Sequence, residues 1–561
     1  MQFSDRSRLC YFYVREAVRR FSHSVSAGRN AVLRLSHRIP DRLIVAPTDL
    51  RPIDPFVAEE ILEGRFPLAG RVLETEGLSP FSLELPSKVF AARLHSFQWL
   101  RHLRAEKTAQ ASVRARVLAD QWIRLHGKRL SGIAWDPDVA ANRLIALLSH
   151  SPVLLQGSEA GFYRRFMRCI AFHVRHLRRI APRAADGEIR FRVRIALAIA
   201  SVAMPVRLSV VRKAGRDLDR EIERQILADG GHVSRNPRVT LDLLLDLLPL
   251  RQTYVNLGHD VPSKLIPGID RMYPALRFFR HQGGDLALFN GATPALANEL
   301  MSVLRYDETG GQPFKALPHS NYQRLQAGNA VVIVDTGFAL SADLSKTAHA
   351  GCLAFELSSG RHRFIVNAGS PKFAGERIRQ LARATAAHST VTLNETSSSR
   401  FSPSPFVGPL VVSGVTRVDV KRQELDDGSD GLLAIHDGYL SAFGVLHERE
   451  LRMDASGTRV SGRDRIVHPD GSNPGTDDQG VAVARFHVHP AIDMVQADRH
   501  TVFLTAPDGE TWVFTASGLD VVISEDVFFA DASGVRHSEQ LEVAFPLATR
   551  PEIRWEFARR K

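Results

Sequence analysis

Two histidines and an arginine in the second half of the chain are residue types that could handle an acidic sugar. His349 stands at a turn that enters an expected strand, and Arg383 and His388 precede another expected strand at residues 389–393. We expect His349 and His388 to face each other across neighbouring strands, because imidazoles move protons near neutral pH and a guanidinium holds a carboxylate. The competing interpretation, of about equal weight, is that His349 is a buried structural histidine that holds its turn.

A second polar group lies in the first half of the chain. His232, Arg235 and Asn236 follow the doublet Gly230-Gly231 at an expected helix boundary, so their side chains could point toward a ligand. Asparagine before proline is also a common helix cap, which would explain Asn236 without any ligand. The sequence leaves both interpretations open.

Three aromatic residues complete the set of candidates. Tyr322 is the tyrosine best placed to exchange a proton, because it lies near the expected joint between the two halves of the chain. Trp99 and Trp135 could stack on sugar rings, although tryptophans at helical spacing more often belong to a core.

The elements that must position these residues differ between the two halves. From about residue 55 to 305 the apolar residues recur with a helical period, which predicts about ten helices in a bundle or toroid. Near Val331 the pattern changes to alternating, β-branched runs separated by turns. We therefore predict a basic N-terminal helix and lead-in (1–54), a helical domain (55–317) and an antiparallel β domain (318–561).

Three sequence segments, in this order, resemble the heparinase II/III family of polysaccharide lyases. They are DGGHVSRNP at 229–237, HAGCLAFEL at 349–357 with IVNAG at 365–369, and RATAAHSTV at 383–391. The resemblance covers roughly residues 55–520. It implies an (α/α) toroid followed by an antiparallel β-sandwich, with a uronate-containing chain bound between them. The implied reaction is β-elimination, in which the uronate carboxylate is neutralised, a base removes the C5 proton and an acid protonates the leaving oxygen.

The family's catalytic motifs are only partly present. Where the family shows His-x-His-x-Asp, with a catalytic first His and a second His that can hold a metal, this chain has Thr347, His349 and Gly351. A further metal-binding Asp of the family corresponds at best to Asn367, and Val239-Thr240 stand where a Tyr-His pair is often found. His349 and His388 alone are too few ligands for zinc, so we expect no cofactor.

Composition and charge limit the classes of ligand that we expect the protein to bind. The 561 residues are 44% apolar and 24% charged, and no run of eighteen apolar residues occurs, which excludes wholesale disorder and predicts no transmembrane segment. The net charge of +12 is uneven, because residues 1–317 hold 48 basic and 31 acidic side chains. Such a field attracts polyanions. No nucleic-acid motif is present, so an acidic polysaccharide or oligosaccharide is the expected partner.

The N-terminal residues form no secretory signal, because arginines interrupt every apolar stretch. They are typical of a basic amphipathic helix that packs on the body or touches a membrane surface. We expect a cytoplasmic location, with the periplasm or cell envelope as the alternative. The expected function is a carbohydrate-active protein that cleaves a uronate-containing polysaccharide by β-elimination, with His349, Tyr322 and His388 as catalytic residues. The alternative is a family member that binds acidic glycans without cleaving them.

Overall fold

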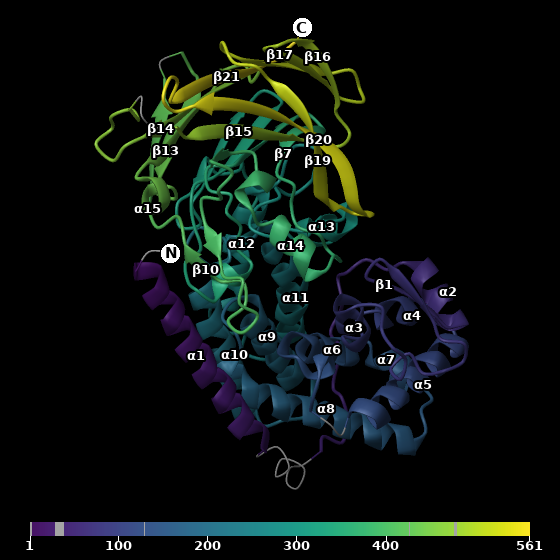
Figure 1. Ribbon diagram of the computed structural model, residues 1–561. Coiled ribbons are helices and arrows are strands. Elements are labelled where there is room, and N and C mark those ends of the chain that lie inside the picture. The colour runs from purple at the N-terminus through teal and green to yellow at the C-terminus, as the bar shows by residue number, and fades with distance from the viewer. Residues whose placement is uncertain (1–2, 29–38, 128–129, 426, 476–478, 561) are drawn as a thin grey trace.

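The computed structural model describes residues 3–28, 39–127, 130–425, 427–475 and 479–560. A helical half is followed along the chain by a β half, which lies above it in Figure 1. This order confirms the predicted toroid followed by a β-sandwich. Residues 29–38 of the predicted lead-in lie outside the described residues.

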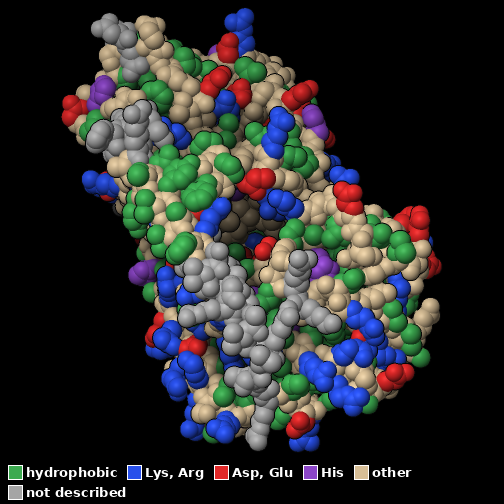
Figure 2. Space-filling model, turned by 60° about the horizontal axis from the view of Figure 1, so that its bottom comes forward, with side chains coloured by type: hydrophobic (Ala, Val, Ile, Leu, Met, Phe, Trp, Pro, Cys, Tyr) green, Lys and Arg blue, Asp and Glu red, His purple; other side chains and the backbone are tan. Residues whose placement is uncertain are grey.

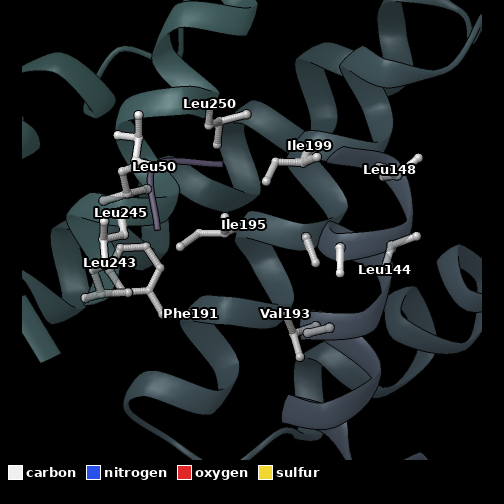
Figure 3. Close-up of a cluster of buried hydrophobic side chains, with 14 of the residues drawn as sticks. Leu50, Leu144, Leu148, Phe191, Val193, Ile195, Ile199, Leu243, Leu245 and Leu250 are labelled. Carbon is white, nitrogen blue, oxygen red and sulfur yellow. The ribbon is translucent and has the colours of Figure 1, made fainter. Parts of the chain in front are cut away.

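Apolar residues of three central helices hold the helical half together. Leu144 and Leu148 of α6, Ile195 and Ile199 of α9, and Leu243 and Leu250 of α11 meet in one buried cluster (Figure 3). The described helices of this half are α2 (Pro55–Glu63), α3 (Lys88–His95), α4 (Leu100–Glu106), α5 (Ala109–His126), α6 (Pro137–Ser149), α7 (Ser151–Leu155), α8 (Ala160–Ile180), α9 (Glu188–Ala203), α10 (Leu208–Gln225), α11 (Pro237–Asn256), α12 (Leu265–Phe278) and α13 (Ala297–Leu304).

One short hairpin interrupts the helices, and the sequence pattern did not predict it. Strands β1 (Arg65–Leu68) and β2 (Arg71–Glu74) pair antiparallel between α2 and α3. Ala69 and Gly70 at its turn both have positive φ, of 51° and 69°. This two-residue turn brings the hairpin tip close to the β half, as described below.

The β half consists of two antiparallel sheets with a shared core. Strand order in one is β11-β12-β13-β14-β21-β18-β17-β16, and in the other β19-β20-β15-β7-β6-β5-β4-β3, with β8 paired to β15. Alternating residues such as Phe355, Phe486 and Trp555 point inward and stack between the sheets.

The strand bounds of the first sheet are β11 (Val418–Glu424), β12 (Asp430–His436), β13 (Leu446–Met453), β14 (Arg459–Val467), β16 (Asp493–Asp498), β17 (Thr501–Thr505), β18 (Thr511–Ala516) and β21 (Glu552–Arg559). Those of the second are β3 (Ala316–Leu317), β4 (Tyr322–Ala327), β5 (Ala330–Asp335), β6 (Phe355–Ser359), β7 (His362–Val366), β8 (Val391–Leu393), β15 (Val481–Val488), β19 (Val522–Asp531) and β20 (Gly534–Pro546). A small separate pair is β9 (Arg400–Phe401) with β10 (Val411–Ser413). Short helices α14 (Glu376–Leu381) and α15 (Leu440–Phe443) interrupt the strands.

The N-terminal helix α1 (Phe3–Gly28) packs on the body, beside β10 and along the helical half (Figure 1). Phe12 is buried against Val407 and Leu410, and Arg15 forms an ion pair with Asp343 at 2.7 Å. In the described part of the chain, no helix has both the length and the apolar character needed to cross a bilayer.

Figure 2 shows a hollow near the centre of one face of the molecule, with basic side chains at its rim and acidic ones inside. Basic side chains also gather over the lower part of this view. The two halves are joined by buried polar contacts, which include His281 Nε2 with Glu356 at 2.9 Å and Arg324 with the carbonyl of Phe278 at 2.7 Å. We call the line along which the halves meet the seam.

Candidate active site

Two loops of the β half bring a pair of histidines together. His349 lies between β5 and β6, and His388 lies between β7 and β8. His349 Nδ1 lies 3.1 Å from His388 Nε2, and His388 Nδ1 lies 2.7 Å from the carbonyl oxygen of Ala384. Because a carbonyl only accepts, the hydrogen of His388 is on Nδ1, and His388 Nε2 accepts from the Nδ1–H of His349. The network therefore assigns a bare lone pair to His349 Nε2.

Both imidazoles are neutral at pH 7. Burial lowers the pKa of His388 to about 4, and burial together with the neighbouring His388 and Arg383 lowers the pKa of His349 well below its ordinary value. His388 is buried, whereas His349 is half-buried. His349 thus combines partial access with the unprotonated form that a general base needs.

Asn236 comes to the same place from the helical half. Its Oδ1 accepts the backbone N–H of Arg238 at 2.9 Å and so caps α11, which leaves the amide Nδ2 as its remaining donor. A Cβ placed on Gly291 would lie 3.1 Å from the carbonyl oxygen of Thr347 and 3.6 Å from both Asn236 Nδ2 and His349 Nε2. A bare acceptor and an amide donor therefore converge on one position of the seam, beside a glycine with a φ of 83°.

The residues around this point do not fit a metal ion. One ring nitrogen of each histidine is taken up by the hydrogen bond between the two rings. The side chain of Asn367 donates to Glu356 and accepts from the backbone N–H of Ser389. A Cβ on Gly351 would lie 2.6 Å from Cδ2 of His388, so the ring occupies the space that an Asp at 351 would need. Among the described residues, no group of three or more His, Cys, Asp or Glu is arranged to hold a metal.

Arg235 and Tyr322, expected to bind substrate and to exchange a proton, instead join the two halves. Arg235 forms a buried ion pair with Asp335 and donates to the carbonyl of Ser320 at 2.8 Å. The Tyr322 hydroxyl donates to the carbonyl of Arg235 at 2.6 Å and accepts from Asn290 at 2.8 Å. Tyr322 is fully buried, and burial raises the pKa of its hydroxyl. The structure thus places Tyr322 in the contact between the halves, with its hydroxyl bonded on both sides.

His232 and Arg383 are also buried and fully engaged. His232 bonds Gln225 at 2.8 Å and Ser234 at 2.7 Å, and burial lowers its pKa to about 3. Arg383 donates to the carbonyls of Ser345 and Ala348 at 2.7 and 2.8 Å. Arg383 therefore shapes the loop that carries His349, and neither side chain is free to bind a sugar.

Trp99 and Trp135 belong to the core of the helical half. Their indole N–H groups donate to the carbonyls of Leu94 and His126, both at 3.0 Å. Both rings are at least 95% buried, and Trp135 also packs on His173. The expected stacking on sugar rings is therefore wrong for both residues, since neither presents a face to solvent.

The sequence interpretation missed Asn290 and Gly291. Asn290 has a φ of 50°, and its amide donates to Tyr322 and Asp335, both at 2.8 Å. The signal was present, because Asn-Gly is a strong turn dipeptide. It lies outside the recognised motifs, in the segment between α12 and α13.

Comparison with known proteins agrees with this architecture. The family described as heparinase II/III-like, C-terminal, matches residues 309–556. FtsZ-localized protein C of Caulobacter vibrioides is 31% identical over 543 residues, covering 94% of this chain and 92% of that protein.

Two solved structures share the fold. Heparinase III superposes with a TM-score of 0.72 at 13% identity, over 94% of this chain and 88% of that one. The heparan sulfate lyase HepC from Pedobacter heparinus has a TM-score of 0.59 at 16% identity, over 99% of this chain and 88% of that one. The family match and the relative that aligns with 94% of this chain show that the chain belongs to the heparinase II/III-like family.

Proposed function

We propose that the seam at Gly291 binds a uronate-containing polysaccharide and that the chain cleaves it by β-elimination, with His349 as the base. The observation that supports this proposal is that a bare His349 Nε2 and the amide of Asn236 approach the same position beside Gly291. The uneven basic charge of residues 1–317 supports an anionic ligand.

Each group would have a defined task. The Asn236 amide donates to the uronate carboxylate and stabilises the negative charge that develops there when C5 loses its proton. His349 Nε2 takes that proton, the C5–H electrons form the C4–C5 double bond, and the C4–O bond breaks with its electrons passing to the glycosidic oxygen. The imidazolium of His349 then returns the proton to this oxygen. Because one group serves twice, the C5 proton and the leaving oxygen must lie on the same face of the sugar.

Binding without cleavage is the second candidate. Thr347 stands where the family places a catalytic histidine, and the Tyr322 hydroxyl is committed to Arg235 and Asn290. With His349 as its accessible imidazole and no free hydroxyl on Tyr322, such a site holds an anionic sugar more readily than it breaks the glycosidic bond.

One experiment separates the two candidates. The protein is incubated with a panel of uronate polymers, and ultraviolet absorbance reports unsaturated product while calorimetry reports binding. Cleavage predicts absorbance that His349→Ala abolishes and that His537→Ala, an exposed histidine on β20, leaves intact. Binding with no absorbance favours the second candidate, and neither binding nor absorbance overturns both.

We also propose that the chain localises with FtsZ, since its Caulobacter relative is named FtsZ-localized protein C. Support comes from identity over nearly the whole of both chains rather than over one domain. The cytoplasmic location and the membrane contact of α1 likewise remain proposals. The outward side chains of α1 at Tyr11, Val14, Val18 and Phe21 recur at helical spacing and are exposed.

Imaging and vesicle binding test these points. A fluorescent fusion should coincide with labelled FtsZ, and a diffuse or peripheral signal unrelated to FtsZ would contradict the association. Full-length protein should sediment with anionic vesicles, and Val14→Glu with Val18→Glu should abolish this. Sedimentation that is unchanged in this double variant would remove α1 from the membrane contact.

A further inference from the structure

A second pair of cations lies on the seam, away from His349. Arg93 comes from α3 in the helical half, and Lys372 comes from the loop after β7 in the β half. Within the described ranges neither side chain has a carboxylate at ion-pair distance. Arg93 has only a long hydrogen bond, of 3.4 Å, to Gln98.

The ring of Phe373 joins the two cations. Its centroid lies 5.9 Å from the guanidinium carbon of Arg93 and 5.5 Å from Nζ of Lys372. The same ring approaches the β1–β2 hairpin, because a Cβ on Gly70 would lie 3.5 Å from its Cδ2. Arg93, Lys372 and Phe373 are all half-buried, so the group is neither core nor open surface.

Neighbouring acids are already committed to other cations. Arg238 bonds Asp242 at 2.8 Å and Glu299 at 2.6 Å. Arg51 likewise bonds Asp246 at 2.7 Å. Burial lowers the pKa of both Lys372 and Arg93. Glu299 acts against this at Lys372 and Asp242 does so at both cations, but only in part, and the charge of Arg238 lowers each pKa further. Two partly desolvated cations that share the more distant acids with Arg238 are stabilised by an arriving anion.

The group and the candidate active site have Arg238 as a common neighbour. Arg238, whose charge acts on both Arg93 and Lys372, stands in the first turn of α11, two residues after Asn236. A saccharide chain that places one uronate at Asn236 and His349 would therefore pass toward Arg93 and Lys372 with its next anionic group.

We propose that Arg93, Lys372 and Phe373 form a second subsite for an acidic sugar residue. The two cations hold its carboxylate or sulfate, and the ring packs against its apolar face. This inference rests on the proposed glycan binding and adds a consequence to it, namely that the ligand carries at least two anionic sugars.

Calorimetric titration with a uronate disaccharide and a uronate hexasaccharide tests the subsite. The wild-type protein should bind the hexasaccharide more tightly. In Arg93→Gln with Lys372→Gln that gain should fall by about tenfold or more, while disaccharide binding at Asn236 stays within about twofold. The matched control is Arg164→Gln with Arg168→Gln, which removes the same charge from the exposed face of α8.

The outcomes distinguish the subsite from the function on which it rests. No binding of either saccharide to the wild-type protein overturns the proposed function. Equal length dependence in the wild-type and double-variant proteins overturns the subsite alone. Arg93→Gln, Lys372→Gln and Phe373→Leu are also measured singly, with thermal melting, so that misfolding of the double variant cannot imitate a lost subsite. Each single variant should lose part of the hexasaccharide gain, and no loss in any of them contradicts the proposal.

Discussion

His349 and Asn236 present complementary atoms because the other polar atom of each side chain is occupied. His388 accepts from His349 Nδ1, and the N–H of Arg238 occupies Asn236 Oδ1. What remains on the open side is one bare acceptor and one amide donor. Positioning therefore depends on His388 and on the start of α11 as much as on the two residues themselves.

Replacing Asn236 with Asp separates its two tasks. The carboxylate still caps α11, and a negative charge at a helix N-terminus is favourable, so the melting temperature should stay within about 2 °C of wild type. The amide donor is lost and a charge that repels a uronate takes its place. Affinity for uronate oligosaccharides, measured by calorimetry, should fall at least about tenfold.

Asn394→Asp is the matched control for this variant. The Oδ1 of Asn394 also accepts a backbone N–H, that of Val481 at 2.8 Å, but the side chain is exposed and lies in the β half. This variant should bind uronates as wild type does. If Asn236→Asp binds equally well, Asn236 is a cap and nothing more.

The sequence predicted which residues gather at the seam better than what each one does there. For Asn236 the helix cap is confirmed, and its amide approaches His349, while ligand binding stays a prediction. Arg235 is expected at the site from its motif, and Tyr322 from its position near the joint between the halves. Their partners Asp335 and Asn290 are remote in sequence, so only the docking of the two halves shows that their polar atoms are consumed.

At the scale of elements, the Asp229-Gly230-Gly231 segment docks the helical half onto the β half. Asp229 accepts the backbone N–H groups of His319 and Ser320, at 2.8 and 2.7 Å. A Cβ on Gly231 would lie 1.9 Å from the hydroxyl oxygen of Ser320, so only glycine permits this approach. The motif that points to the family is thus, in this chain, a joint between domains.

Gly231→Ala should loosen that joint. The added methyl group overlaps Ser320, and overpacking of this kind costs about 1–3 kcal/mol. The free energy of unfolding, measured by urea denaturation, should fall by that amount. Gly375→Ala is the control, because no atom lies within 4 Å of its added Cβ and the φ of Gly375 is −69°. Equal stability of the two variants would contradict the docking role.

The helix α1 packs on the body, the arrangement that the sequence favoured over contact with a membrane. Arg8 of α1 and His349 line the same cavity of about 240 Å³, so this end of the helix lies close to the candidate site. Phe12 is the anchor, since it is buried against Val407 and Leu410.

Phe12→Asp should detach α1 from the body. A buried charge without a partner is unfavourable, so the helix should separate and be cut by trypsin faster than in the wild-type protein. Val14→Asp places the same charge on a side chain that is 59% exposed, and it should leave the cleavage rate unchanged. Equal cleavage of the two variants would show that Phe12 does not hold the helix.

For the whole molecule, the period of the apolar residues was sufficient to predict helices followed by strands. Clusters such as Leu144 with Ile195 and Phe355 with Trp555 follow directly from periods of 3.6 and 2. The β1–β2 hairpin could not be predicted, because four-residue strands are too short to show an alternation of apolar and polar residues. The pairing order of the strands in the two sheets could not be predicted either, because contacts between distant strands leave no local signal in the sequence.

Stability of the whole molecule should decline as the pH falls below about 6.5. Burial lowers the pKa of several histidines from an ordinary value of 6.5 to about 3 for His95, His102, His232 and His489, and to about 4 for His388. Between pH 6.5 and these values the unfolded chain binds more protons than the native protein, so each step toward acid favours unfolding. Above pH 6.5 these groups contribute no pH dependence.

Since one pKa unit corresponds to about 1.4 kcal/mol, the free energy of unfolding should be lower at pH 5 than at pH 7 by at least about 2 kcal/mol. Urea denaturation at the two pH values measures this difference, and His232→Gln should reduce it by removing one of the titrating groups. A difference that is absent in the wild-type protein would mean that these histidines are protonated as readily in the folded state as in the unfolded chain, and His349 and His388 would then lose the main support for their neutral form.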